Sequence, residues 1–129
     1  MHQTILLIIL FSCHFLADYT HLSTNWMLSA KRFGTPLFPI LCHALVHTLL
    51  MGLAIMLFNH IYRVEFRTFL FCLLFQLISH FAIDVWKGRM NGLFPTLQSP
   101  ANKWHWVMFG FDQLLHAVVI IFMVNTIIN

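Results

Sequence analysis

Residues that could bind a metal ion recur along this chain in pairs, and the two members of each pair are four positions apart. The four pairs are His14/Asp18, His43/His47, His80/Asp84 and Asp112/His116. In an α-helix, positions with this spacing lie on one face, one turn apart. Imidazole nitrogens and carboxylate oxygens are ligands for zinc, iron and manganese. The spacing therefore predicts four helices, each presenting two metal ligands on one face.

The pairs lie within four long apolar stretches. Of the 129 residues, 60% are hydrophobic and 9% are charged, whereas a soluble domain carries about 25% charged residues. Each stretch approaches the roughly 20 residues that a helix needs to cross a bilayer, and lipid favours helices because it offers no partner to unpaired backbone groups. We therefore expect an all-α membrane protein, a single domain over residues 1–129, with transmembrane helices at about residues 4–22, 37–58, 66–86 and 106–128.

The order of the pairs indicates an internal repeat. The His–Asp pair recurs after 66 residues (14 to 80), and the pairs of the second and fourth helices are 69 residues apart (47 to 116). We expect two tandem helical hairpins that enter the membrane in the same sense, a parallel repeat with a pseudo-twofold axis along the membrane normal. The pair lies near the C-terminal end of the first and third helices and near the N-terminal start of the second and fourth. All eight side chains are therefore expected in one layer.

The basic residues indicate how the chain is oriented. The connections at residues 23–36 and 87–105 share one side of the membrane and carry five basic residues, against two on the other side: Lys31, Arg32, Lys87, Arg89 and Lys103 against Arg63 and Arg67. By the positive-inside rule, the first and third connections are cytoplasmic and both termini lie outside. The basic residues are scattered and form no stripe, so we expect no nucleic-acid partner.

Three carboxylates within a membrane need compensating charge. An ionised residue at the bilayer centre costs about 2.5–3.5 kcal/mol, and a structural zinc site contributes roughly 10 kcal/mol or more. We therefore expect one or two divalent ions. Two ions with a hydroxide would neutralise the carboxylates, and one ion assisted by Lys87 would do the same. Zinc, iron and manganese all accept these ligands. Zinc is preferred over iron because the Glu-x-x-His motif of di-iron bundles is missing. The only glutamate, Glu65, lies on the opposite side of the membrane.

The succession of motifs resembles a known family. The order HFLADY, NWM followed by Lys31, HALVH, HFAIDVWK and FDQLLH is similar to that of small bacterial membrane proteins known only as a domain of unknown function, over His14 to His116. This resemblance implies a four-helix protein of the bacterial inner membrane and no particular activity. More loosely, the pattern resembles membrane-embedded metal-dependent hydrolases, including ceramidase-like ones, which carry His and Asp ligands within the membrane.

The favoured hypothesis is a membrane-embedded, metal-dependent hydrolase. A metal ion lowers the pKa of its bound water toward 7, and that water attacks an ester, amide or phosphoester of a lipid or lipid-linked substrate. The eight paired residues are the expected ligands, and Asp18 or Asp84 is the expected general base. Lys87 shares a helix face with His80 and Asp84, so it could hold an anionic headgroup or the charge that develops in the reaction.

Other functions are also compatible with the sequence. His and Asp chains form paths for protons or divalent metals in transporters and channels, but the far halves of these helices are almost wholly apolar, which argues against a path through one subunit. A structural or regulatory subunit could use the pairs as a buried His–Asp network, which is the simpler explanation for one pair alone. An oxidoreductase could use two irons. Because a bundle of four helices is thin, a homo-oligomer is compatible as well, although no clear GxxxG face identifies its interface.

Overall fold

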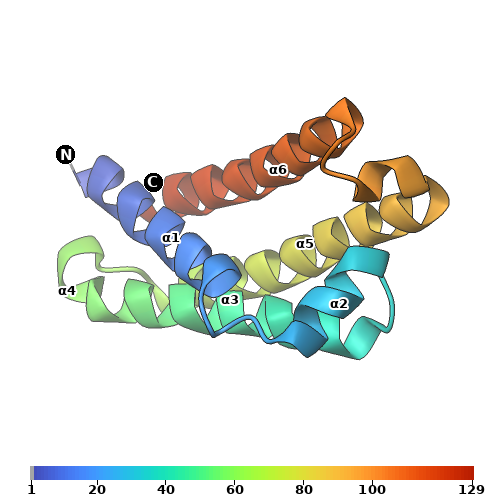
Figure 1. Cartoon of the computed structure of the whole chain (residues 1–129). Coiled ribbons are helices and arrows are strands. Elements are labelled where there is room, and N and C mark those ends of the chain that lie inside the picture. Colours follow the sequence, from blue (N-terminus) through green and yellow to red (C-terminus); the bar gives the residue numbers. More distant parts are fainter. Residues whose placement is uncertain (1) are drawn as a thin grey trace.

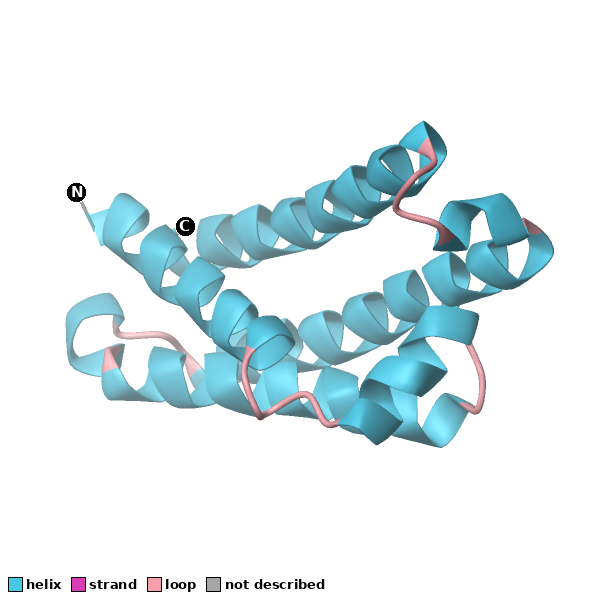
Figure 2. Cartoon of the chain, viewed as in Figure 1, coloured by secondary structure: helices cyan, strands magenta, loops and turns pink. Residues whose placement is uncertain are grey.

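The computed structural model describes residues 2–129, and no β-strand occurs among them. The elements in chain order are α1 (His2–Tyr19), α2 (Asn25–Phe33), α3 (Leu37–Leu57), α4 (Asn59–Tyr62), α5 (Phe66–Leu93), the 3-10 helix η1 (Pro95–Gln98) and α6 (Lys103–Ile128). Short loops join these helices (Figure 2). Four of them, α1, α3, α5 and α6, are long and apolar enough to cross a membrane. The expectation of an all-α protein with four such helices is confirmed.

The four long helices form a closed ring of neighbours. α1 packs on α3, α3 on α5, α5 on α6, and α6 on α1. α1 and α5 run in one direction, and α3 and α6 return in the other (Figure 1). Both termini and α4 therefore lie at one end of the bundle, called here the terminal end, whereas α2 and η1 lie at the opposite end, called here the α2 end (Figure 1). These directions fit two successive hairpins, and a symmetry between the hairpins stays a prediction.

An apolar core fills the bundle toward the terminal end. Its most deeply buried members come from all four long helices: Leu6, Leu10, Met51, Ile55, Cys72, Ile120, Met123 and Val124. The outward-facing side chains are apolar as well; Leu49 is 68% exposed and Ile78 is 66% exposed. A helix that is apolar on every side is typical of a membrane span. The surface is thus compatible with a lipid environment.

The segment 23–36, expected as a connection between two spans, contains the helix α2. The hydroxyl of Thr24 caps its start by accepting a hydrogen bond from the backbone N–H of Met27, as Thr does at helix N-termini. Gly34 ends the helix with φ at +70°, in the left-handed region that glycine adopts without strain. α2 packs on both α3 and α5, so this connection covers the α3 and α5 side of that end of the bundle.

The helices on either side of residues 87–105 are longer than the apolar pattern indicated. α5 continues past Trp86 to Leu93, and α6 begins at Lys103, where the side chain of Asn102 caps the first turn. The added turns of α5 are polar, so hydrophobicity alone could not predict them. They persist because they have partners, since the side-chain amide of Asn91 donates to the carbonyl oxygen of Arg32 at the end of α2.

Two glycines allow α2 to approach α5 closely. A Cβ atom added to Gly88 would lie 2.1 Å from the backbone nitrogen of Gly34 and 2.5 Å from the carbonyl oxygen of Lys31. A Cβ atom added to Gly34 would lie 2.6 Å from the backbone nitrogen of Arg89. The backbones of the two helices are therefore in direct contact, which fixes the distance from α2 to the centre of the bundle.

This contact predicts that Gly88→Ala destabilises the protein. The new methyl group would meet backbone atoms, which cannot rotate away, and overpacking of this kind costs about 1–3 kcal/mol. We expect a clearly lower Tm for the detergent-purified variant in a tryptophan-fluorescence melt. Gly110→Ala in α6 is the matched control, because a Cβ there has no neighbour within 4 Å. Equal Tm values for the two variants would show that α2 is not held in this way.

Candidate metal centre

All eight paired residues converge in the middle of the bundle, between the apolar core and the α2 end. They form four overlapping groups, and within each group the ligand atoms lie within 4.8 Å of one another. The groups are His14/His47/His80, Asp18/His43/His47, His43/His80/Asp84 and Asp84/Asp112/His116. Seven of these residues are buried, and Asp18 is partly buried. The structure therefore brings together every residue that the spacing singled out. Such buried groups could hold a metal ion.

Helix direction sorts the eight residues into two tiers. Members of a pair are one turn apart, about 5.4 Å along the axis, and α3 and α6 run opposite to α1 and α5 (Figure 1). The inner tier, next to the apolar core, is His14, His47, His80 and His116, and the outer tier, toward the α2 end, is Asp18, His43, Asp84 and Asp112. The layer of four pairs therefore consists of a ring of histidines beneath a mainly carboxylate ring.

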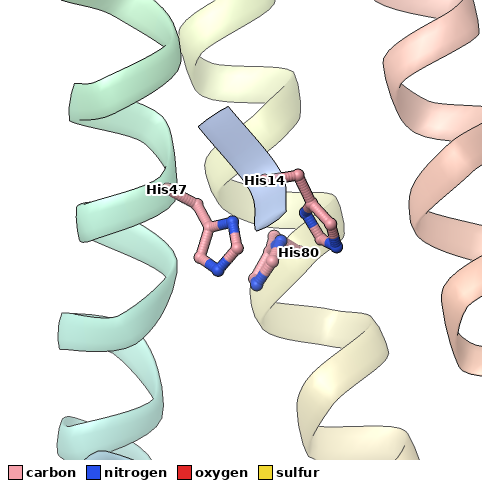
Figure 3. Close-up of side chains that lie close together, drawn as sticks. All are labelled: His14, His47 and His80. Carbon is pink, nitrogen blue, oxygen red and sulfur yellow. The ribbon is translucent and has the colours of Figure 1, made fainter. Parts of the chain in front are cut away.

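The inner tier is closely packed. The ring centroids of His47 and His80 are 3.9 Å apart, those of His80 and His116 are 4.3 Å apart, and those of His14 and His47 are 4.8 Å apart. Figure 3 shows His14, His47 and His80 meeting between their three helices. Three imidazoles that converge in this way match the three protein ligands typical of catalytic zinc sites.

Hydrogen bonds at Nδ1 of two histidines leave their Nε2 atoms facing the other groups of the cluster. The hydroxyl of Ser23 donates to the carbonyl oxygen of Ala17, so it accepts the N–H of Nδ1 in His43, 3.0 Å away. In the same way, Nδ1 of His116 donates to the backbone carbonyl of Asp112 at 2.8 Å. Metal-binding histidines are commonly oriented by such bonds from the other ring nitrogen.

Ring nitrogens and carboxylate oxygens therefore face one another inside the cluster. Nε2 of His43 lies 3.1 Å from Oδ1 of Asp18, and Nε2 of His116 lies 3.8 Å from Oδ1 of Asp84. Such pairs of atoms are stable only with a proton or another cation between them. Ten buried side-chain atoms of the described residues lack a hydrogen-bond partner, and nine belong to the cluster, including both oxygens of Asp84. Each orphaned group costs about 1–3 kcal/mol, and a bound cation would satisfy them.

Lys31 is the residue that sequence analysis missed. Its ammonium extends from α2 into the outer tier, 3.0 Å from Oδ1 of Asp18, 3.1 Å from Nε2 of His43 and 3.3 Å from Oδ1 of Asp84. Burial lowers the pKa of Lys31, but Asp84 and Asp18 raise it more, so the pKa lies above its ordinary value. Lys31 is therefore a permanent cation. Its position in the NWM–Lys motif was the only signal in the sequence, because a residue between two spans has no helical register with them.

Lys87 lies beside the cluster rather than within it. Its ammonium is 2.8 Å from Oδ2 of Asp112 and 5.3 Å from the centre of the Phe109 ring. Gln76 lies one turn before His80 on α5, and its side-chain amide contacts Nδ1 of His80 at 3.4 Å. Asp84 lies one turn after His80 on the same face. Lys31 and Lys87 thus contact all three aspartates between them.

A cavity of about 500 Å³ adjoins the outer tier at the α2 end. Asp18 and Asp112 form part of its lining together with Lys31 and Lys87. Exposed side chains such as Arg32 also line it. Molecules arriving from the α2 end could therefore reach two of the clustered carboxylates, whereas the apolar core covers the other side of the inner tier.

The chain belongs to the family described as "Protein of unknown function (DUF3307)", whose model matches residues 6–129. Membership in a family of unknown function, expected from the motif order, is confirmed. No curated protein and no solved structure matches the chain. The looser resemblance to membrane-embedded hydrolases stays a prediction.

The position of Lys31 predicts competition between its ammonium and metal ions in the outer tier. Lys31→Gln leaves Asp18 and Asp84 without their nearest cation, and breaking a buried ion pair costs about 3–5 kcal/mol. We expect a lower Tm for the metal-free variant and a larger rise on adding zinc than in the wild type, measured by thermal shift after chelation. Lys103→Gln, an exposed change outside the cluster, should leave both values unchanged. An equal zinc response in the wild type and Lys31→Gln would contradict the competition.

Proposed function

We propose that this protein is a membrane-embedded, zinc-dependent hydrolase that acts on a lipid or lipid-linked substrate. The observation that carries the proposal is the set of buried imidazole nitrogens and carboxylate oxygens that lack hydrogen-bond partners beside a cavity. A hydrogen-bonded structural network would pair donors with acceptors, whereas these atoms need a cation. Iron and manganese accept the same ligands.

Charge balance favours a single metal ion. The three aspartates are matched by two ammonium groups, those of Lys31 and Lys87, which leaves one uncompensated negative charge. One divalent ion, with one further anion beside it, would make the centre neutral, as a low-dielectric environment favours. We assign the ion to His14, His47 and His80, because Lys31 already occupies the space between the outer-tier groups. Two ions would leave an excess of positive charge.

The residues around the ion have distinct roles. Zinc supplies Lewis-acid chemistry, polarising an ester oxygen and acidifying water. Asp18 lies both in the cluster and on the cavity wall, so its carboxylate is positioned to take the proton of the attacking water and pass it to the leaving group. Asp84, fully buried beside His80 and His43, supplies negative charge next to the imidazoles. Lys87 faces the cavity and stabilises negative charge that develops on the substrate. Water is the only co-reactant that hydrolysis consumes.

The apolar core supports an enzyme over a transporter. Beyond the inner tier, the described residues that fill the bundle are mainly apolar, with Leu10, Met51 and Ile120 at most 1% exposed. The buried polar side chains of Thr48 and Gln76 lie next to the histidines. A path for metal ions or protons needs polar groups or water on both sides of its binding site. Access from the α2 end alone suits a substrate that enters and leaves by one route.

We also propose that the α2 end faces the cytoplasm of a bacterial cell. Five of the seven Lys and Arg residues belong to the connections at that end, and the positive-inside rule places such connections in the cytoplasm. The cavity would then open toward the inner leaflet of the inner membrane. The exposed apolar helix faces also leave room for a homo-oligomer in the membrane.

Zinc content tests the metal centre. We expect about one zinc per chain in wild-type protein by elemental mass spectrometry, with purification through a tag free of histidine. His47→Ala removes one inner-tier imidazole and is expected to lose most of this zinc, because loss of a ligand sharply lowers affinity. His60→Ala, an exposed histidine in α4, should retain it. A folded wild type that takes up no zinc, or His47→Ala with full zinc, would refute the assignment.

Asp18→Asn separates metal binding from catalysis. The amide keeps the shape of the carboxylate but cannot take up a proton, so hydrolysis should fall by roughly 10²–10⁴-fold while zinc bound by the inner tier is retained. The measurement is release of a fluorophore from umbelliferyl esters and phosphates in mixed micelles, with zinc content determined on the same samples. Undiminished turnover in a zinc-loaded Asp18→Asn variant would remove Asp18 from the mechanism.

A further inference from the structure

The cavity at the α2 end carries more positive than negative charge. Three cationic side chains line it, those of Lys31, Arg32 and Lys87, together with two carboxylates, those of Asp18 and Asp112. Both lysines already contact these carboxylates. Arg32 has no acidic partner among the described residues. Its guanidinium contacts the side-chain carbonyl of Gln98 at 3.4 Å and lies 5.4 Å from the centre of the Phe33 ring. The guanidinium is therefore available to an anionic ligand.

The charges that line the cavity fit a phosphate group. The lysines and Arg32 against the two carboxylates leave one excess positive charge. A lipid phosphate carries at least one negative charge at neutral pH, which matches this excess. Arg also presents a planar fork of donors that fits phosphate oxygens. Arg32 and Lys87 lie on different helices that border the same space.

The rest of the cavity wall is apolar, and its surroundings match a membrane interface. Leu28, Leu97 and Met108 line the wall beside the charged groups. The four tryptophans of the chain also belong to the helices and turns near the α2 end: Trp26, Trp86, Trp104 and Trp106. Tryptophan gathers at the headgroup level of membranes. A cavity of about 500 Å³ accommodates a headgroup and the start of its chain, and exposed apolar side chains such as Leu93 lie nearby for the remainder.

We propose that this cavity binds the phosphate headgroup of an amphiphile, with the phosphate against Arg32 and Lys87 and the chain along the apolar wall. The substrate class of the proposed hydrolase is then a phosphate-bearing lipid, a step that rests on the proposed function. Binding itself does not depend on hydrolysis. The interfacial position favours a lipid over soluble inorganic phosphate, which shares the same headgroup chemistry.

Native mass spectrometry of the zinc-loaded protein in a neutral maltoside detergent tests the headgroup site. The probes are dioleoyl phosphatidic acid, dioleoyl phosphatidylcholine and inorganic phosphate. We expect phosphatidic acid to bind about tenfold more tightly than phosphatidylcholine, and Arg32→Gln to reduce its affinity on the order of tenfold, as loss of a charged hydrogen bond does. Lys103→Gln is the matched control, because Lys103 is exposed at the same end but does not line the cavity.

Each alternative outcome is decisive. Equal affinity for the two lipids, or an equal loss in Lys103→Gln, would overturn the headgroup site, since general surface charge would then explain binding. Inorganic phosphate that binds through Arg32 when phosphatidic acid does not would overturn the lipid assignment. The same spectra report zinc, which separates the two proposals: binding through Arg32 without zinc refutes only the metal centre, and zinc without such binding refutes only the headgroup site.

Discussion

The constraint on which this structure depends is the cost of three carboxylates buried inside an apolar bundle. Asp84 and Asp112 are fully buried, and a buried charge is tolerated only when other charges and hydrogen bonds compensate it. Two features provide this compensation. The ammonium groups of Lys31 and Lys87 contact all three aspartates, and the facing imidazoles form groups with them that could hold a metal ion. The close contact of Gly34 with Gly88 serves the same constraint, because it brings α2 near enough for Lys31 to reach the centre.

The two ends of the bundle have different properties as a consequence. Toward the terminal end, the inner histidines lie against a mainly apolar core, with Gln76 buried beside His80. Toward the α2 end, the outer tier borders a cavity with basic and apolar walls. A metal centre that is closed on one side and accessible on the other suits chemistry on a molecule that approaches from the interface. Burial of the histidines keeps water from competing for their ring nitrogens. The partly buried Asp18 links the centre to the cavity.

The sequence predicted those parts of the structure that follow from periodicity. The length of the apolar stretches located four helices, and the four-residue spacing identified the eight paired residues as neighbours. Both patterns are properties of single helices, and the order of the helices in the chain determines that their pairs lie at the same height. It could not predict Lys31, since that residue acts across a connection and its position depends on the packing of α2. It also missed Ser23, whose bond to His43 depends on the path of the chain after α1, and the polar end of α5, which hydropathy cannot distinguish from a loop.

The central claim is that histidines of the inner tier hold zinc, and zinc-edge X-ray absorption spectroscopy of the metal-loaded protein tests it most directly. The account predicts nitrogen and oxygen neighbours with zinc–nitrogen distances of about 2.0–2.1 Å and the outer-shell scattering pattern of about three imidazole rings. A shell containing sulfur at about 2.3 Å would instead place the metal on a cysteine, such as Cys13 or Cys72 in the apolar core. That result, or a shell of oxygen alone without imidazole scattering, would contradict the account.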